Sequence, residues 1–195
     1  MVPEIDNINH DQVPLPFGGG ARGGVGGVGG VGGAALAHDP TLSPESRVWV
    51  YTASRRLTDA EAEFTRQQTA AFLQTWTAHN QALLAKSELI DNQLLLLVVD
   101  ETQAGASGCS IDKSVHFLEQ LGQRLGLDWF ERMRFGWVDA AGELYFADRA
   151  EFAALRQAGT ITDSTLVVNT LVQKRGELAD QWLIPYAQSW HRRLF

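Results

Sequence analysis

The sequence is poor in cysteine, since Cys109 is the single cysteine among its 195 residues. One thiol excludes a disulfide within the chain and any zinc site built from several cysteines. We therefore expect neither a metal nor a cofactor. Because unpaired thiols are typical of reducing compartments, we also expect a cytoplasmic protein.

The chain also lacks a long apolar run. The longest one, residues 94–99, is far shorter than the roughly 20 residues that cross a bilayer. Acidic residues at positions 4, 6 and 11 accompany an N-terminal region without the apolar core of a signal peptide. We therefore expect no membrane partner.

Clustered positive charge is missing as well. The formal net charge is −7, and no long run of Lys or Arg occurs. Nucleic-acid affinity depends on such clusters, so a nucleic-acid partner is not expected.

Glycine dominates one part of the chain. Residues 1–46 include the stretch GGGARGGVGGVGGVGGAALA. Glycine loses the most entropy on ordering, and few side chains here offset that loss. We predict a disordered Gly-rich extension over 1–46 and a single globular domain over 47–195.

The remainder reads as an α+β protein. A strand is expected over 47–55, a helix from Thr58, two strands across 82–100 with a turn at Asp91-Asn92, and a helix over 111–125. A hairpin over 133–148 follows. This β-α-β-β-α-β order predicts a ferredoxin-like sandwich.

A C-terminal extension should follow the sandwich. We expect a short helix near 149–158, a strand near 165–169 and a helix near 175–182. Beyond them, Trp182, Tyr186 and Trp190 belong to an apolar strap that packs on the core. The alternative is that these aromatic side chains form a surface for a protein partner.

The loop that leads into the second long helix, residues 100–117, is the first candidate site. A helix N-terminus presents free N–H groups and a partial positive charge, which suit an anion. Such a site would recognise a small anion or a partner's acidic chain. Its ligand-binding residues would be Ser107, Gly108, Ser110, Lys113 and Ser114.

Thiol chemistry at the same loop is the alternative. A cysteine beside a helix N-terminus has a lowered pKa, which makes its thiolate more available. Cys109 would then be the nucleophile, His116 the base, and Asp100 or Glu101 the acid that orients the base.

The stretch LLLLVVDETQ resembles the Walker B segment of ABC-transporter ATPases. That resemblance implies a magnesium role for Asp100 and a water-polarising role for Glu101. However, no G-x-x-x-x-G-K-[ST] motif occurs, and the Ser-Gly-Gly-Gln signature of that family is missing. Asp112 stands where a glycine should precede the lysine, so ATP hydrolysis is not supported.

Three stretches, RVWVYTASR, DETQAGASGCSIDKSVHF and IPYAQSWHRRLF, resemble short bacterial proteins that often carry the label "ABC transporter ATPase". The resemblance covers most of residues 47–195. It implies a cytoplasmic protein and assigns no catalytic residue.

Residues 137–169, WVDAAGELYFADRAEFAALRQAGTITDSTLVVN, resemble the GYF-type modules of bacterial proteins. That resemblance implies a peptide-binding adaptor and makes 137–195 a small add-on to the domain. Leu144-Tyr145-Phe146 stands in place of the Gly-Pro-Phe-like core of that family. An ordinary hairpin, helix and strand would give the same pattern.

Because each catalytic motif is incomplete, the sequence favours a binding or adaptor protein. An enzyme or redox-responsive protein that uses Cys109 is the alternative.

Overall fold

The apolar run of residues 94–100 forms the central strand of an antiparallel sheet. In a computed structural model, which describes residues 34–102 and 105–195, β5 (Leu94–Asp100) lies between β1 (Arg47–Thr52) and β4 (Leu84–Ile90). Every residue of β5 is buried. Leu94, Leu96 and Val98 face one core, whereas Leu95 and Leu97 face another. The run is continuous because both faces of the strand are covered.

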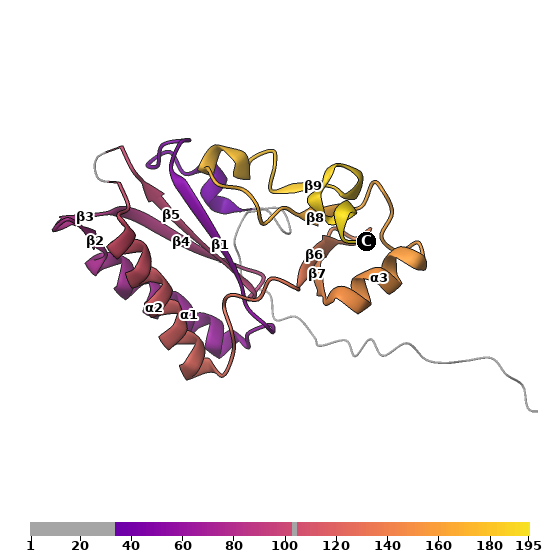
Figure 1. Cartoon of the computed structure of the whole chain (residues 1–195), viewed down its shortest axis with the longest axis horizontal. Helices are drawn as coiled ribbons and strands as arrows, with labels where there is room; N and C mark the ends of the chain where they lie inside the picture. Colours follow the sequence, from indigo (N-terminus) through magenta and orange to yellow (C-terminus); the bar gives the residue numbers. More distant parts are fainter. Residues whose placement is uncertain (1–33, 103–104) are drawn as a thin grey trace, which may run out of the picture.

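The other elements of the described residues follow the α+β class that the sequence predicts, and Figure 1 shows their arrangement. The α-helices are α1 (Asp59–Thr75), α2 (Gly108–Leu125) and α3 (Arg149–Gln157). The remaining strands are β2 (Thr77–Ala78), β3 (Gln81–Ala82), β6 (Phe135–Val138), β7 (Leu144–Ala147), β8 (Leu166–Val168) and β9 (Leu183–Pro185). The 3₁₀ turns are η1 (Ala35–His38), η2 (Arg175–Leu178), η3 (Tyr186–Gln188) and η4 (Trp190–Arg193).

Helices α1 and α2 cover one face of the first sheet (Figure 1). Thr58 caps α1 and forms the predicted reciprocal pair with Glu61. Asp91 and Asn92 form the predicted turn between β4 and β5, both with positive φ. Local sequence therefore determines these two features.

The opposite face is covered by residues that precede β1. Leu36 and Leu42 are buried in the same core as Val48, and the buried Arg175 donates hydrogen bonds to the carbonyl oxygens of Ala37 and Ser43. The prediction of a disordered extension is therefore wrong for 34–46, because these residues bury apolar side chains that the β5 face requires. Residues 1–33 of that prediction lie outside the described residues.

The described residues do not form a complete ferredoxin-like sheet. The strand expected to be its fourth member, β6, pairs with β7 and β8 in a second sheet of order β7-β6-β8-β9. The free edge of β1 is instead bordered by the chain near residue 173. Val48 donates its N–H to Gln173 at 2.8 Å, and Arg175 donates to Ser46 at 2.8 Å. The later segment therefore occupies the place of the missing strand.

The C-terminal extension matches the prediction in part. Helix α3 and strand β8 lie where they were expected. Of the helix predicted near 175–182, residues 175–178 form the 3₁₀ turn η2, and the helix does not continue to 182 before β9 pairs with β8. Pairing with β8 requires an extended chain at 183–185, which a continuing helix would prevent.

The two sheets share a core. Leu144, Val168 and Trp182 from the second sheet and its connections pack with Val48 and Leu94 of the first. A further core around Phe135 and Phe152 is formed by the second sheet, α3 and the C-terminal turns that carry Tyr186 and Trp190. Among the described residues, no helix has the length and apolarity to span a membrane.

Candidate functional site

Asp100 is the last residue of β5, and its side chain accepts hydrogen bonds from two backbone N–H groups. Its two carboxylate oxygens accept hydrogen bonds from the N–H of Ser43 at 2.8 Å and of Thr102 at 2.9 Å. Hydrogen bonding from the Thr102 side chain, then from these N–H groups, holds the pKa of Asp100 below its usual value. The carboxylate therefore stays ionised and fastens the turn to the segment before β1.

Glu101 has a similar local role. Its side chain is exposed, and Oε1 accepts a hydrogen bond from the N–H of Ala106 at 2.9 Å. The bond closes the loop before α2, within which residues 103 and 104 lie outside the described part. Neither acid is directed by the structure toward Cys109 or His116.

The helix after this loop begins three residues earlier than predicted. Ser107 is its N-cap, and its hydroxyl oxygen accepts a hydrogen bond from the N–H of Ser110 at 3.3 Å. The hydroxyl of Ser110 donates to the Ser107 carbonyl at 2.8 Å, and that of Ser114 donates to the Ile111 carbonyl at 2.7 Å. Ser110 and Ser114 are both buried. Ser110 and Ser114 therefore stabilise the helix start and do not face solvent as ligand donors would.

The residues proposed for thiol chemistry are not brought together. Cys109 and His116 are both exposed on α2, seven residues apart. Seven residues of α-helix span about 10 Å, which is beyond hydrogen-bond reach. His116 lies 2.9 Å from Gln120 and 3.7 Å from Glu119 instead. The imidazole is therefore unable to serve the thiol as a direct base in this arrangement.

The two remaining candidates of the loop are exposed. Gly108 lies in the first turn of α2 with no atom near the position of a Cβ. Lys113 reaches the hydroxyl of Thr77 at 3.4 Å. The ammonium group of Lys113 is therefore directed to Thr77, and no contact joins it to Gly108 among the described residues.

The aromatic strap is part of the core. Trp182 is 2% exposed and Tyr186 is 3% exposed. Trp190 is half-buried and stacks on His191 with 4.0 Å between ring centroids. The strap interpretation is therefore confirmed, and Trp182 and Tyr186 offer no surface to a partner.

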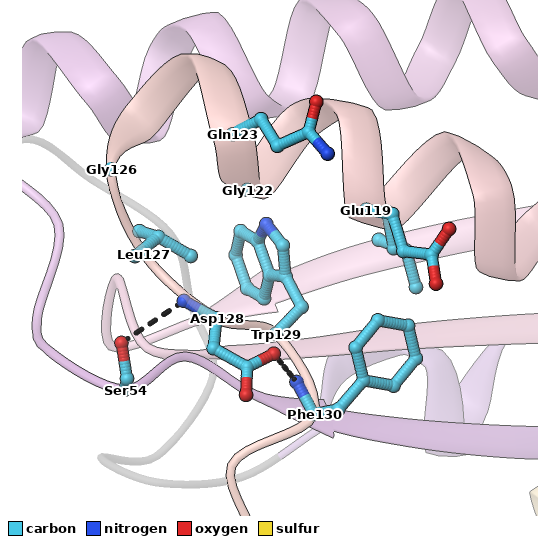
Figure 2. A pocket seen from close by; sticks show the side chains of 10 residues that line it. Ser54, Glu119, Gly122, Gln123, Gly126, Leu127, Asp128, Trp129 and Phe130 are labelled. Atoms are coloured by element: carbon cyan, nitrogen blue, oxygen red, sulfur yellow. Dashed lines mark hydrogen bonds between the residues drawn. The ribbon is translucent and has the colours of Figure 1, made fainter.

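A first surface hollow, of about 780 Å³, lies beside the C-terminal half of α2 (Figure 2). Figure 2 shows the Trp129 indole lying against the helix at Gly122. A Cβ at Gly122 would lie 2.6 Å from the Leu127 carbonyl oxygen, so only glycine allows this approach. The indole nitrogen of Trp129 is buried and has no hydrogen-bond partner among the described residues.

The rim of this hollow is polar. The N–H of Asp128 donates a hydrogen bond to the hydroxyl oxygen of Ser54 at 3.1 Å. The Oδ1 of Asp128 accepts a hydrogen bond from the N–H of Phe130 at 2.8 Å (Figure 2). Glu119 adds a second carboxylate to the lining. Sequence reasoning missed this hollow, although the glycine at 122 and the Leu-Asp-Trp-Phe stretch after α2 mark it.

A second and larger hollow lies between the β6–β7 hairpin, α3 and the chain that leads into β8. Its volume is about 1320 Å³. We call it the β6–α3 groove, and its lining residues are Trp137, Val138, Asp139, Ala140, Tyr145, Phe146, Ala147, Glu151, Ala154, Leu155, Ala158, Thr160, Thr162, Ser164, Thr165 and Leu166. The hairpin and α3 lie at the end of the molecule away from α1 and α2 (Figure 1).

Aromatic and aliphatic side chains form the floor of the groove. Trp137 and Tyr145 are cross-strand partners and stack, with 5.3 Å between ring centroids and 27° between planes. Tyr145 is 37% exposed and Leu166 is 38% exposed. Covering an exposed apolar side chain in such a hollow with a ligand removes apolar surface from water and therefore favours binding.

The charges at this groove are negative and held in place. Asp139 accepts hydrogen bonds from the N–H groups of Ala141 and Glu143, at 2.9 and 2.8 Å. Glu151 accepts from the N–H of Asp148 at 2.9 Å as part of the capping box of α3. No Lys, Arg or His belongs to the lining of this groove. An acidic ligand therefore finds no counter-ion here.

All of the groove residues lie within 137–169, the stretch that resembles GYF-type modules. Sequence reasoning found this segment but did not identify the groove, because the hollow depends on how α3 and the chain before β8 lie against the hairpin.

Comparisons with known proteins add no relative. No protein-family model matches the chain, and no curated protein or solved structure does so either.

Proposed function

We propose that the protein is a non-catalytic binding module that holds a short, extended, largely uncharged peptide with proline and apolar side chains. The observation that carries the proposal is the β6–α3 groove, with exposed Tyr145 stacked on Trp137 and no cation in its lining. Aromatic-lined grooves recognise such peptides because the extended proline-rich backbone is already ordered before it binds.

The position of the groove supports the same function. The resemblance of 137–169 to GYF-type modules implies a peptide-binding adaptor, and the groove lies in this stretch. The binding or adaptor class expected from the sequence is retained, while its site moves away from the loop over 100–117. That loop is better explained as a helix cap, because Ser107, Ser110 and Asp100 are engaged with the backbone.

Thiol-dependent catalysis has less support. The exposure of Cys109 is compatible with it. The separation of His116 from Cys109 along α2 and the engagement of Asp100 with two backbone N–H groups count against it.

The test is a titration of the full ¹⁵N-labelled chain with a synthetic proline-rich peptide of roughly ten residues that contains leucine and no charge. We expect the largest shifts at amides of 137–140, 145–147 and 160–166. Tyr145→Ala should weaken binding about five- to thirtyfold, as the loss of an aromatic anchor does. Leu171→Ala is the matched control, since Leu171 is 62% exposed but lies outside the groove. Unchanged groove amides at millimolar peptide, or equal binding by Tyr145→Ala, would refute the proposal.

A further inference from the structure

The chain itself contains a segment with the chemistry that the β6–α3 groove calls for. Residues 13–17 read Val-Pro-Leu-Pro-Phe, with three apolar side chains, two prolines and no charge. Proline fixes its own φ and disfavours the helical backbone at the residue before it, so a peptide of this sequence binds in an extended form. An uncharged segment also suits a groove whose lining holds two carboxylates and no cation.

The segment is joined to the fold by a long glycine-rich spacer. Residues 18–33 separate Phe17 from Ala34, the first described residue, and 11 of these 16 residues are glycine. A chain of this length spans at most about 55 Å. A domain of the described size is only about 40 Å across. Ala34 belongs to the same apolar cluster as Val138 and Phe146, two residues of the groove lining, so a spacer of this length allows the segment to reach the groove.

We propose that residues 13–17 occupy the β6–α3 groove of their own chain as a tethered ligand. This inference rests on the proposed function of the groove and assigns it an occupant. A ligand joined to its site by a glycine-rich linker of about this length has an effective concentration of about 1 mM. A partner peptide therefore has to displace the segment before it binds, and the segment sets the affinity threshold of the module.

The experiment compares three full-length chains. The segment variant carries Val13→Ser, Leu15→Ser and Phe17→Ser. The spacer control carries Val25→Ser, Val28→Ser and Val31→Ser, which removes three apolar side chains next to the segment without altering it. The probe is a fluorescent peptide of residues 11–19, titrated into each chain, and the indole N–H resonance of Trp137 is recorded without peptide.

We expect the segment variant to bind the probe at least about tenfold more tightly than the unmodified chain and the spacer control, because competition from the tether is lost. The Trp137 resonance should shift in the segment variant alone. Equal probe affinity in all three chains overturns the inference, as does a Trp137 shift that depends on protein concentration, since the occupant is then a second copy.

The two proposals fail in different ways. If the proline-rich peptide binds the groove but the 11–19 probe does not, the tethered ligand is refuted and the proposed function stands. If neither peptide binds any of the three chains, the proposed function is refuted as well.

Discussion

The indole nitrogen of Trp76 donates a buried hydrogen bond of 2.8 Å to the carbonyl oxygen of Ser110. Trp76 is the C-cap of α1, and Ser110 lies in the first turn of α2. One bond thus connects the end of one helix to the start of the next, across 34 residues of sequence. This contact helps to position the start of α2.

Replacement of Trp76 by Phe should destabilise the protein. The change removes a buried hydrogen bond, for which we expect a loss of about 1–2 kcal/mol in the free energy of unfolding. Urea denaturation measures this loss. The control is Trp49→Phe, which removes the same atoms from a neighbouring ring that is only half-buried and lies 6.1 Å away. Equal losses in the two variants would show that ring volume matters and the hydrogen bond does not.

Two glycines of α2 should respond differently to alanine. Gly122→Ala places a Cβ 2.6 Å from a backbone oxygen, which has to move, so we expect a loss of about 1–3 kcal/mol. Gly108→Ala meets no atom within 4 Å and should cost nothing. Thermal and urea unfolding of both variants compare them within one helix. A stable Gly122→Ala protein would mean that the turn after α2 adapts without strain.

The buried His191 should make stability depend on pH. Burial lowers the pKa of this imidazole from 6.5 to about 4, between the rings of Phe152 and Trp190. Between these two pH values the unfolded chain binds more protons than the folded one, so stability falls as the pH falls. The full effect is about 3 kcal/mol, reached near pH 4.

The measurement is the free energy of unfolding of His191→Asn between pH 7 and pH 5. Asparagine does not titrate, so the slope of this variant should be flatter than that of the unmodified chain. His116→Asn, at an exposed position on α2, is the control and should retain the original slope. Parallel slopes in all three proteins would assign the pH dependence to other groups.

Arg175 should hold the segment before β1 in place. Arg175→Met removes the donors to Ala37 and Ser43, and a lost bond from a charged donor costs about 1.5–3 kcal/mol. Amide hydrogen exchange in residues 36–43 should quicken. The neighbour Lys174 is exposed and pairs with the exposed Glu45, so Lys174→Met should leave the exchange of this segment unchanged. Faster exchange in both variants would indicate that charge alone accounts for the effect.

Cys109 should react with iodoacetamide in the folded protein, since its side chain is exposed in the first turn of α2. The His116→Ala variant should react at the same rate within about twofold, because a base two helical turns away does not assist the thiol. Mass spectrometry reports the adduct without ambiguity in a chain with one cysteine. A much slower variant would restore the pairing of Cys109 with His116.

Local patterns predict the elements of this fold well. The hydroxyl and acid of Thr58 and Glu61 define the start of α1, and Asp91-Asn92 defines the turn between β4 and β5. The apolar alternation around Trp137 and Tyr145 predicts the hairpin. Each of these features depends on contacts between residues that are close in sequence.

The parts that sequence reasoning missed depend on distant contacts. Whether β6 joins the first sheet is decided by competition with the chain near Gln173, which pairs with Val48. The position of Leu36 depends on the face of β5 that α1 and α2 do not cover, because Leu36 packs against that face. The β6–α3 groove depends on the distance between α3 and the hairpin. The pattern of apolar residues within the helix or within the hairpin does not predict that distance.

The pairing of Val48 with Gln173 has a consequence for synthesis of the protein. Strand β1 is translated long before Gln173 and Trp182, which complete its edge and the core beneath it. Contacts of such large sequence separation form slowly, and the apolar face of β5 stays open until they do. The apolar face of a nascent chain is therefore open to association until Gln173 and Trp182 have emerged from the ribosome.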